Sequence, residues 1–262
     1  MRISIASYSF HGLIRAGMMD IYGYLETCKF RYGLDAADIW NGTLGPDPSA
    51  YLHRDVLAKV RAALDERAMT VANYHADQVH AWEDDPERRE AHRRMALEHL
   101  RAAEYLGAKT VRIDAGGRGQ VWTPEQFDYI VARFQEYCAR AADNGYRLGP
   151  ESHWGPELVP DNMERLARAV NNPAFGVLIH LGHWDQSTPE EGDRRLAPYA
   201  MHTHVDQKTA EQRLEPAMRT LLAAGYAGYW GVEHHSARNE YAEVERQLAA
   251  VRRALKKIQT EG

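Results

Sequence analysis

Cysteine is scarce in this sequence: of 262 residues, two are cysteines, Cys28 and Cys138. They lie far apart, each in a stretch with a helical pattern, and neither has the paired spacing of a zinc or redox motif. The sequence therefore excludes a disulfide-stapled fold. We expect two buried thiols in a reducing compartment.

Long apolar runs are also missing, and none is long enough to cross a bilayer. The N-terminal segment MRISIASYSF has one arginine followed by a strand-like pattern, unlike the core of a signal peptide. We therefore expect a cytoplasmic protein that has no membrane partner.

The chain has no excess of positive charge. It holds 32 Lys and Arg against 37 Asp and Glu, a net charge of −5. This balance gives no general attraction to nucleic acid and favours a small-molecule partner. With 44% apolar and 26% charged residues, the chain can bury a sizeable core.

What the sequence does contain is a regular alternation of short apolar segments and amphipathic stretches. Eight segments have strand patterns: Arg2–Ser7, Asp35–Trp40, Thr70–His75, Thr110–Asp114, Arg147–Glu151, Gly176–His180, Ala200–His204 and Tyr229–Glu233. The helical stretches between them include Tyr51–Ala68, Pro86–Leu106, Thr123–Asp143, Ala210–Ala224 and Tyr241–Lys257. No linker interrupts the pattern, so we predict one domain over residues 1–262.

This alternation predicts an α/β fold, a single (β/α)8 TIM barrel. A doubly wound open sheet is the alternative. The first strand-to-helix turn, SFHGLIRAG, lacks the GxGxxG pattern that would favour dinucleotide binding on such a sheet.

Thirteen histidines are present, and several fall at predicted strand ends. In a barrel, the chemistry lies at the C-terminal ends of the strands. Four consecutive strands end in Glu151, His180, His204 and Glu233, at steps of 29, 24 and 29 residues. Two carboxylates and two imidazoles suit one divalent metal ion. We expect manganese first, with cobalt, iron or zinc as alternatives.

Other polar and aromatic residues follow the same strand ends. His75, Asp114, Trp40 and Trp184 are predicted to bind substrate, although core packing is an equal alternative for the tryptophans. His202, two residues before His204, is expected to support the ligands by hydrogen bonds, with direct ligation left open. His234 is expected to face the helices. Surface or cap roles are expected for His11, His53, His80 and His92, with His11 also a weak pocket candidate.

Three segments resemble the xylose isomerase-like TIM barrels of the sugar phosphate isomerase/epimerase superfamily. They are LGAKTVRIDAGG (Leu106–Gly117), GPESHWG (Gly149–Gly155) and GYAGYWGVEHH (Gly225–His235). The resemblance runs through nearly the whole chain and implies Glu, Asp, His and Glu as metal ligands on strands five to eight. Glu151, His204 and Glu233 match this set, whereas His180 stands where the Asp is expected.

The resemblance has two further consequences for the substrate site. His183 matches a substrate-binding histidine of the epimerases. In THVDQ (Thr203–Gln207), Asp206 occupies the place of a lysine found in many relatives. This change removes a cation that could hold an anionic substrate, and Asp206 is expected to lie behind the ligands.

The resemblance implies a metal-dependent sugar isomerase or epimerase that acts on an α-hydroxyketone through an enediolate. Glu151 and Glu233 would transfer protons, and His153 would be a further donor or base. A lyase that eliminates from a keto-sugar is the main alternative. An endonuclease-IV-type repair enzyme and a non-catalytic sugar-binding subunit are weaker ones. Relatives form dimers or tetramers, and a lyase could require a partner subunit.

Overall fold

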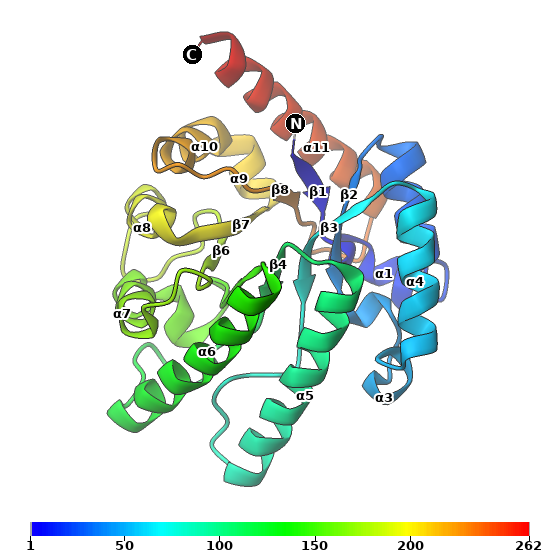
Figure 1. The fold of residues 1–262 in the computed structure, drawn as a ribbon. Helices are drawn as coiled ribbons and strands as arrows, with labels where there is room; N and C mark the ends of the chain where they lie inside the picture. Colours follow the sequence, from blue (N-terminus) through cyan, green and yellow to red (C-terminus); the bar gives the residue numbers. More distant parts are fainter. Residues whose placement is uncertain (1, 262) are drawn as a thin grey trace.

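The computed structural model describes residues 2–261, and its strands are all parallel and surrounded by helices (Figure 1). The strands form two four-stranded sheets with orders β1-β8-β7-β6 and β2-β3-β4-β5. Their bounds are β1 Ile3–Ile5, β2 Ala36–Trp40, β3 Thr70–His75, β4 Thr110–Arg112, β5 Arg147–Gly149, β6 Val177–His180, β7 Ala200–Val205 and β8 Trp230–Val232. The prediction of a TIM barrel is confirmed.

The two sheets meet at both edges. Ala6 forms a parallel bridge with Asp38 at one seam, and Glu151 forms one with Leu178 at the other. At the first seam the Tyr24 hydroxyl donates to the Ile5 carbonyl at 2.5 Å and accepts from the Asp38 amide at 2.8 Å. The hydroxyl therefore takes the place of a ladder hydrogen bond between β1 and β2.

The second seam depends on a glycine. A Cβ at Gly149 would lie 1.7 Å from the carbonyl oxygen of Gly176, so no larger residue fits where β5 approaches β6. This close approach brings Glu151, two residues further along, to the same end of the barrel as His180.

The long helices begin and end where local signals place them. In α6 (Pro124–Asn144), Thr123 and Gln126 form a capping box. Gly107 and Gly145 end α5 (Pro86–Leu106) and α6 in the left-handed region, with φ of 74° and 73°. The other long helices are α4 (Arg54–Glu66), α7 (Pro160–Val170), α10 (Leu214–Ala223) and α11 (Glu240–Glu261).

Two predicted helices are interrupted. Residues 51–68 belong to α3 (Pro48–Tyr51) and α4, because His53 leaves the helix and its side chain accepts from the Asp55 amide. Residues 210–224 are divided between α9 (Gln207–Gln212) and α10, with Arg213 outside the helical region at φ −150° between them. Pro216 follows this break and cannot donate the hydrogen bond that would continue α9.

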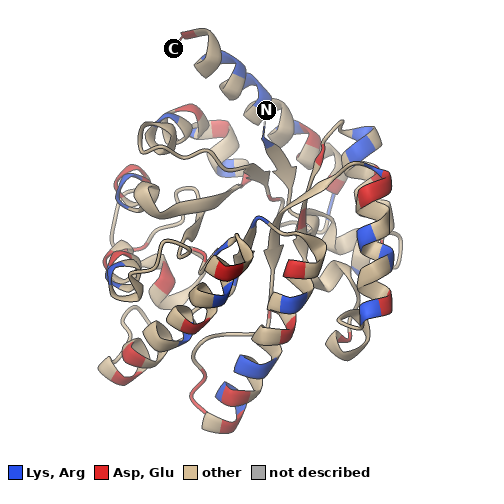
Figure 2. Cartoon of the chain, viewed as in Figure 1, with Lys and Arg blue, Asp and Glu red and all other residues tan. Residues whose placement is uncertain are grey.

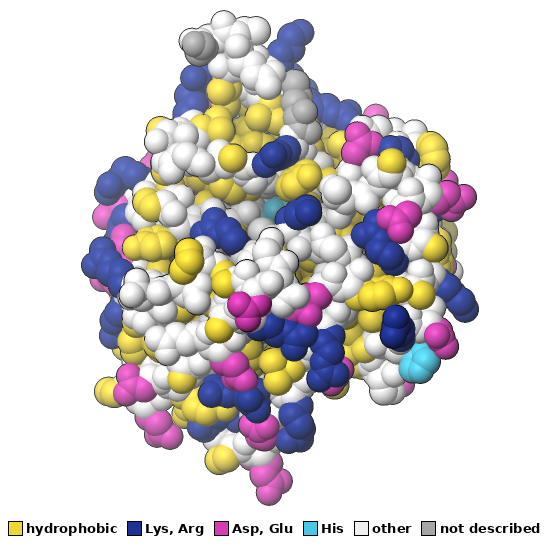
Figure 3. Space-filling view, in the orientation of Figure 1, with side chains coloured by type: hydrophobic (Ala, Val, Ile, Leu, Met, Phe, Trp, Pro, Cys, Tyr) yellow, Lys and Arg dark blue, Asp and Glu magenta, His cyan; other side chains and the backbone are white. Residues whose placement is uncertain are grey.

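The outer surface carries charges of both signs on the helices (Figure 2). Blue and magenta side chains are interspersed over the face seen in Figure 3, so that face has no patch of one sign. Cys28 and Cys138 are buried and free, as predicted. No helix within residues 2–261 is long and apolar enough to cross a membrane.

Candidate metal centre

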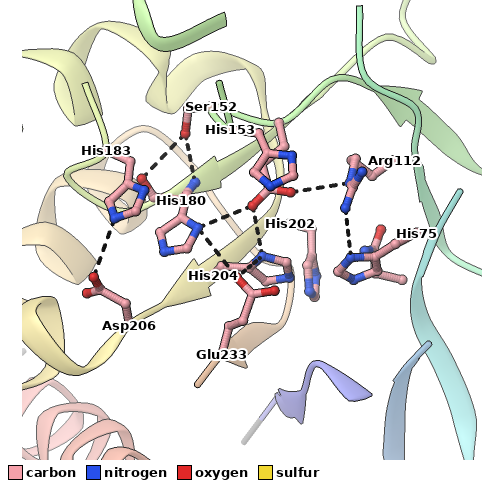
Figure 4. Close-up of polar contacts among 12 residues, drawn as sticks. His75, Arg112, Ser152, His153, His180, His183, His202, His204, Asp206 and Glu233 are labelled. Atoms are coloured by element: carbon pink, nitrogen blue, oxygen red, sulfur yellow. Dashed lines mark hydrogen bonds and ion pairs between the residues drawn. The ribbon is translucent and has the colours of Figure 1, made fainter. Parts of the chain in front are cut away.

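Four side-chain atoms from four consecutive strand ends converge inside the barrel (Figure 4). Nδ1 of His204 lies 2.9 Å from Glu151 Oε1 and 3.1 Å from Glu233 Oε2. Nδ1 of His180 lies 3.3 Å and 3.5 Å from the same two oxygens. We call these residues the ligand ring; it consists of the four residues predicted to bind metal.

Strand pairing brings the four residues of the ligand ring together. His180 ends β6 and pairs directly with His204 on β7. Glu233 follows β8 by one residue, and its amide donates to Val205 at the end of β7. Glu151 follows β5 by two residues. Strands four, five and eight therefore end one or two residues earlier than predicted, and their carboxylates lie on the connections just beyond.

The glutamates and His204 of the ligand ring shift one another's pKa values strongly. Burial alone would raise the pKa of Glu151 and of Glu233, but His204 lowers both well below their ordinary values. Burial alone would lower the pKa of His204, yet Glu233 and Glu151 raise it well above its ordinary value. Burial lowers the pKa of His180. The two carboxylates therefore create a negative potential that positive charge must offset.

The donor set fits a divalent ion. Metal–ligand bonds of about 2.0–2.2 Å hold neighbouring donors about 2.9–3.6 Å apart in tetrahedral or octahedral sites. The four ring separations of 2.9, 3.1, 3.3 and 3.5 Å fall within this range. Two carboxylates balance a double positive charge, and two imidazoles suit the borderline transition metals.

A buried arginine lies beside the ligand ring, at a position that no sequence motif indicated. Arg112 ends β4 with its side chain 4% exposed, and its Nε lies 3.2 Å from Glu151 Oε2. Its Nη1 lies 2.7 Å from Asp77 Oδ1 and 3.0 Å from Asp114 Oδ2. Burial lowers the pKa of Arg112 but the carboxylates of Asp114 and Asp77 raise it above its ordinary value. In the sequence, a single charge within an apolar strand indicates a buried ion pair at this position.

Asp38 on β2 is a second buried charge that no sequence motif indicated. Its carboxylate is fully buried, with His75 Nε2 2.5 Å from Oδ1 and His202 Nε2 2.6 Å from Oδ2. Burial raises the pKa of Asp38, but the imidazoles of His202 and His75 lower it well below its ordinary value. His75 and His202 therefore face Asp38; the hydrogen bond of His202 is to this carboxylate, and its ring lies 5.6 Å from the His204 ring.

On the other side of Glu151, His153 and Asp114 form a pair. His153 Nδ1 lies 3.1 Å from Asp114 Oδ2, which also accepts the indole N–H of Trp154 at 3.2 Å. Burial lowers the pKa of His153, but Asp114 and Glu151 raise it to about 9. Its side chain is 43% exposed, which leaves this imidazolium accessible from solvent.

Two more histidines pack against His180. The His183 ring stacks on the His180 ring at 3.8 Å between centroids, and the His235 ring lies at 5.2 Å. His183 Nε2 is 3.4 Å from Asp206 Oδ2, and His235 Nε2 is 3.0 Å from Glu233 Oε2. Asp206 also caps α9 by accepting the Thr209 amide at 2.7 Å. Figure 4 shows His183 and Asp206 on the far side of His180 from His204.

The predicted aromatic walls differ in their surroundings. Trp40 donates its indole N–H to Asp77 at 2.6 Å, and Asp77 is one of the carboxylates that pair with Arg112. Trp184 packs against Gly192 of α8 (Pro189–Leu196) and donates to Asp193 at 2.8 Å, so its contacts are with the surrounding helix.

The remaining histidines lie outside the ligand ring, as predicted. His53 caps α4, and His234 is buried and contacts the Arg238 carbonyl at 3.1 Å. His11 stacks on Tyr8 at 4.5 Å. His80 and His92 lie near one another beside Glu83, with His80 Nδ1 3.0 Å from its carboxylate.

Comparisons with known proteins identify the family. The family model for the xylose isomerase-like TIM barrel matches residues 30–258. The chain belongs to this family. A comparison with curated proteins finds no match for the sequence.

Solved structures of similar fold include an L-ribulose 3-epimerase (TM-score 0.78, 14% identity, covering 99% of this chain and 96% of that one). A probable 3-DHS dehydratase, AsbF from Bacillus anthracis, has a TM-score of 0.70 at 12% identity, covering 96% and 98%. A xylose isomerase-like protein from Mycobacterium smegmatis in complex with magnesium has a TM-score of 0.70 at 18% identity, covering 95% and 97%. At these identities, the likeness establishes the shared fold.

Proposed function

We propose that this protein is a divalent-metal-dependent sugar isomerase or epimerase acting on an α-hydroxyketone. The observation that carries the proposal is the ligand ring: four buried donor atoms from Glu151, His180, His204 and Glu233, separated by 2.9–3.5 Å. When bound, the metal would polarise the substrate carbonyl and so acidify the neighbouring C–H. Manganese is the first expectation, and His180 in place of a carboxylate favours cobalt, iron or zinc over magnesium.

The two ring glutamates are not equivalent. The second oxygen of Glu151, Oε2, is paired with Arg112 at 3.2 Å, which holds this side chain as a carboxylate. The contacts of Glu233 with His180, His204 and His235 all use Oε2, and Oε1 takes part in none of them. We therefore assign removal of the carbon-bound proton to Glu233 Oε1. For isomerisation Glu233 would return this proton to the adjacent carbon, and for epimerisation the proton on the opposite face would come from solvent, because Glu151 is held ionised.

The remaining polar groups would bind the substrate oxygens. His153 is accessible and is held by Asp114, so its free Nε2–H can donate to a substrate hydroxyl or carbonyl. His183 lies beside His180 with its side chain 41% exposed, and it can donate to a second oxygen. The L-ribulose 3-epimerase of similar fold supports a ketose as the substrate class.

The experiment for this proposal is proton exchange. Metal-loaded protein would be incubated with a panel of ketoses in D2O, and NMR would follow deuterium at the carbon beside the carbonyl. Exchange that occurs in the metal-loaded wild type and disappears when the metal is removed supports the proposal. Absence of exchange with every ketose, in protein shown to hold metal, would contradict it.

A lyase is the second candidate, and the His153–Asp114 pair favours it. Asp114 and Glu151 raise the pKa of His153 to about 9 against the effect of burial, so its ring is protonated at neutral pH. A protonated group beside the ring could protonate a leaving oxygen while Glu233 removes the proton on the adjacent carbon. The dehydratase of similar fold supports this alternative. Release of water or an aglycone from a keto-sugar would distinguish the two functions.

A further inference from the structure

Asp38 is a buried carboxylate, and a buried charge is costly unless other groups compensate it. It sits in β2 among apolar neighbours, and its side chain is fully buried. The β2–β3 pairing shifts between Ala37 and Asp38, which pair with Val71 and Asn73. An irregularity of this kind re-aims a side chain. Here the Asp38 carboxylate meets three imidazoles, of His75, His202 and His204.

The contacts of Asp38 lead to the ligand ring in two directions. In one direction, Asp38 Oδ2 faces His204 Nε2 at 3.6 Å, and Nδ1 of the same imidazole lies 2.9 Å from Glu151 Oε1. In the other, Asp38 Oδ1 contacts His75 Nε2 at 2.5 Å, and His75 Nδ1 lies 3.4 Å from Arg112 Nη2. Arg112 Nε then reaches Glu151 Oε2 at 3.2 Å. Both series of contacts therefore end at the carboxylate of Glu151.

Asp38 is not itself placed as a metal ligand. Its 2.5 Å and 2.6 Å contacts with His75 and His202 have hydrogen-bond length. Two donors on one metal ion keep a separation of about 2.9 Å or more. The carboxylate therefore acts on the ring through the imidazoles that surround it.

We propose that Asp38 is the positioning residue of the ligand ring, an inference that rests on the proposed metal site. A neutral imidazole has one N–H and one lone pair, so a histidine that binds metal through Nδ1 carries its proton on Nε2. Nε2 of His204 is buried and has no hydrogen-bond partner within residues 2–261; Asp38 is the carboxylate that faces it. Asp38 thereby selects the tautomer that turns the His204 lone pair toward the ring. Through His75 and Arg112 it also orients Glu151.

Cobalt binding tests the proposal without any substrate. Co²⁺ affinity would be measured by chelator competition, and its visible absorption recorded, for wild type, Asp38→Asn and the control Asp193→Asn. Asp193 is an equally buried carboxylate that contacts Gly182, Trp184 and Arg213 instead of the ring. We expect Asp38→Asn to weaken Co²⁺ binding about 10- to 100-fold and to change the absorption bands. Asp193→Asn should alter neither.

Each outcome separates this inference from the proposed function. Equal affinity and identical absorption in wild type and Asp38→Asn would overturn the role of Asp38 while leaving the metal site in place. A folded wild type that binds no Co²⁺ would overturn the metal site, and the positioning role with it.

A measurement on the wild type covers the case in which Asp38→Asn does not fold. In zinc-loaded protein, NMR should show a downfield, slowly exchanging Nε2–H on His204, identified by its loss in His204→Asn. A proton on Nδ1, or an Nε2–H that exchanges freely, would overturn the proposal.

Discussion

Arg112 Nε lies 3.2 Å from Oε2 of Glu151, while the other oxygen of the same carboxylate faces the two imidazoles of the ligand ring. One side chain therefore connects a buried cation to the candidate metal centre. His204 lowers the pKa of this buried glutamate most, and Arg112 adds a second positive neighbour, so the fold and the site depend on each other.

Replacing Arg112 should lower the free energy of unfolding. In Arg112→Met, the carboxylates of Asp77, Asp114 and Glu151 lose their common cation, and breaking a buried pair of this kind costs about 3–5 kcal/mol. Urea unfolding of the metal-free protein measures the loss. Arg195→Met is the control, because Arg195 pairs with Asp161 and Glu164 near the surface and should cost less than about 1 kcal/mol. Equal losses in the two variants would contradict the account of Arg112.

Stability should fall in mild acid because of His99. This side chain on α5 contacts the Tyr74 hydroxyl at 2.8 Å, and burial lowers its pKa to about 4. The unfolded chain, with a histidine pKa of about 6.5, binds the proton first. The contribution of neutral His99 is therefore complete above about pH 6.5 and is lost progressively as the pH falls toward 4.

The matched variant for this effect is His99→Gln, which keeps an acceptor for Tyr74. Between pH 8 and pH 5, wild type should lose about 2 kcal/mol more of its free energy of unfolding than His99→Gln. Urea titrations at the two pH values give the difference. Parallel losses in both proteins would show that His99 does not carry the acid sensitivity.

His180 should set the choice of metal. The substitution His180→Asp introduces the carboxylate that the family resemblance implies at this position and adds a negative charge to the ligand ring. We expect it to raise the affinity for magnesium relative to the transition metals, because oxygen ligands suit the harder ions. Competition between the metals for wild type and His180→Asp measures the shift. An unchanged order of affinities would mean that His180 does not contact the ion.

His153 separates the two candidate reactions. In a lyase, His153→Gln should slow product release about 100-fold or more while deuterium exchange at the substrate carbon persists. In an isomerase, exchange and product formation should fall together, because the same hydrogen bond supports both. His53→Gln serves as the control, since His53 caps α4 outside the ligand ring. Full activity in His153→Gln would remove this residue from both mechanisms.

The ligand ring could be predicted from sequence because each member lies at or just beyond the end of its own strand, at a regular interval. Glu151, His180, His204 and Glu233 occupy equivalent places on neighbouring strands, and the barrel geometry then brings them together. The strand ends were less predictable. Glu151 and Glu233 lie just past β5 and β8, since ladder hydrogen bonding stops before the apolar pattern does.

The groups behind the ligand ring could not be predicted in the same way. Asp38 and Arg112 each appear in the sequence as a single charge in an apolar strand, which signals a buried partner without naming it. The partners that connect them to one another and to the ligand ring are 37 or more residues away in sequence, at His75, Glu151 and His202. The register shift that turns Asp38 toward these imidazoles is a property of strand pairing and leaves no mark in the residue pattern.

Metal content tests the central claim most directly. Elemental analysis would compare wild type, His180→Ala, Glu233→Gln and the surface control His53→Ala after incubation with manganese, cobalt, iron and zinc. We predict about one divalent ion per chain in wild type and His53→Ala, and its loss in the two ring variants. A folded wild type that remains free of metal under all four conditions would contradict the account.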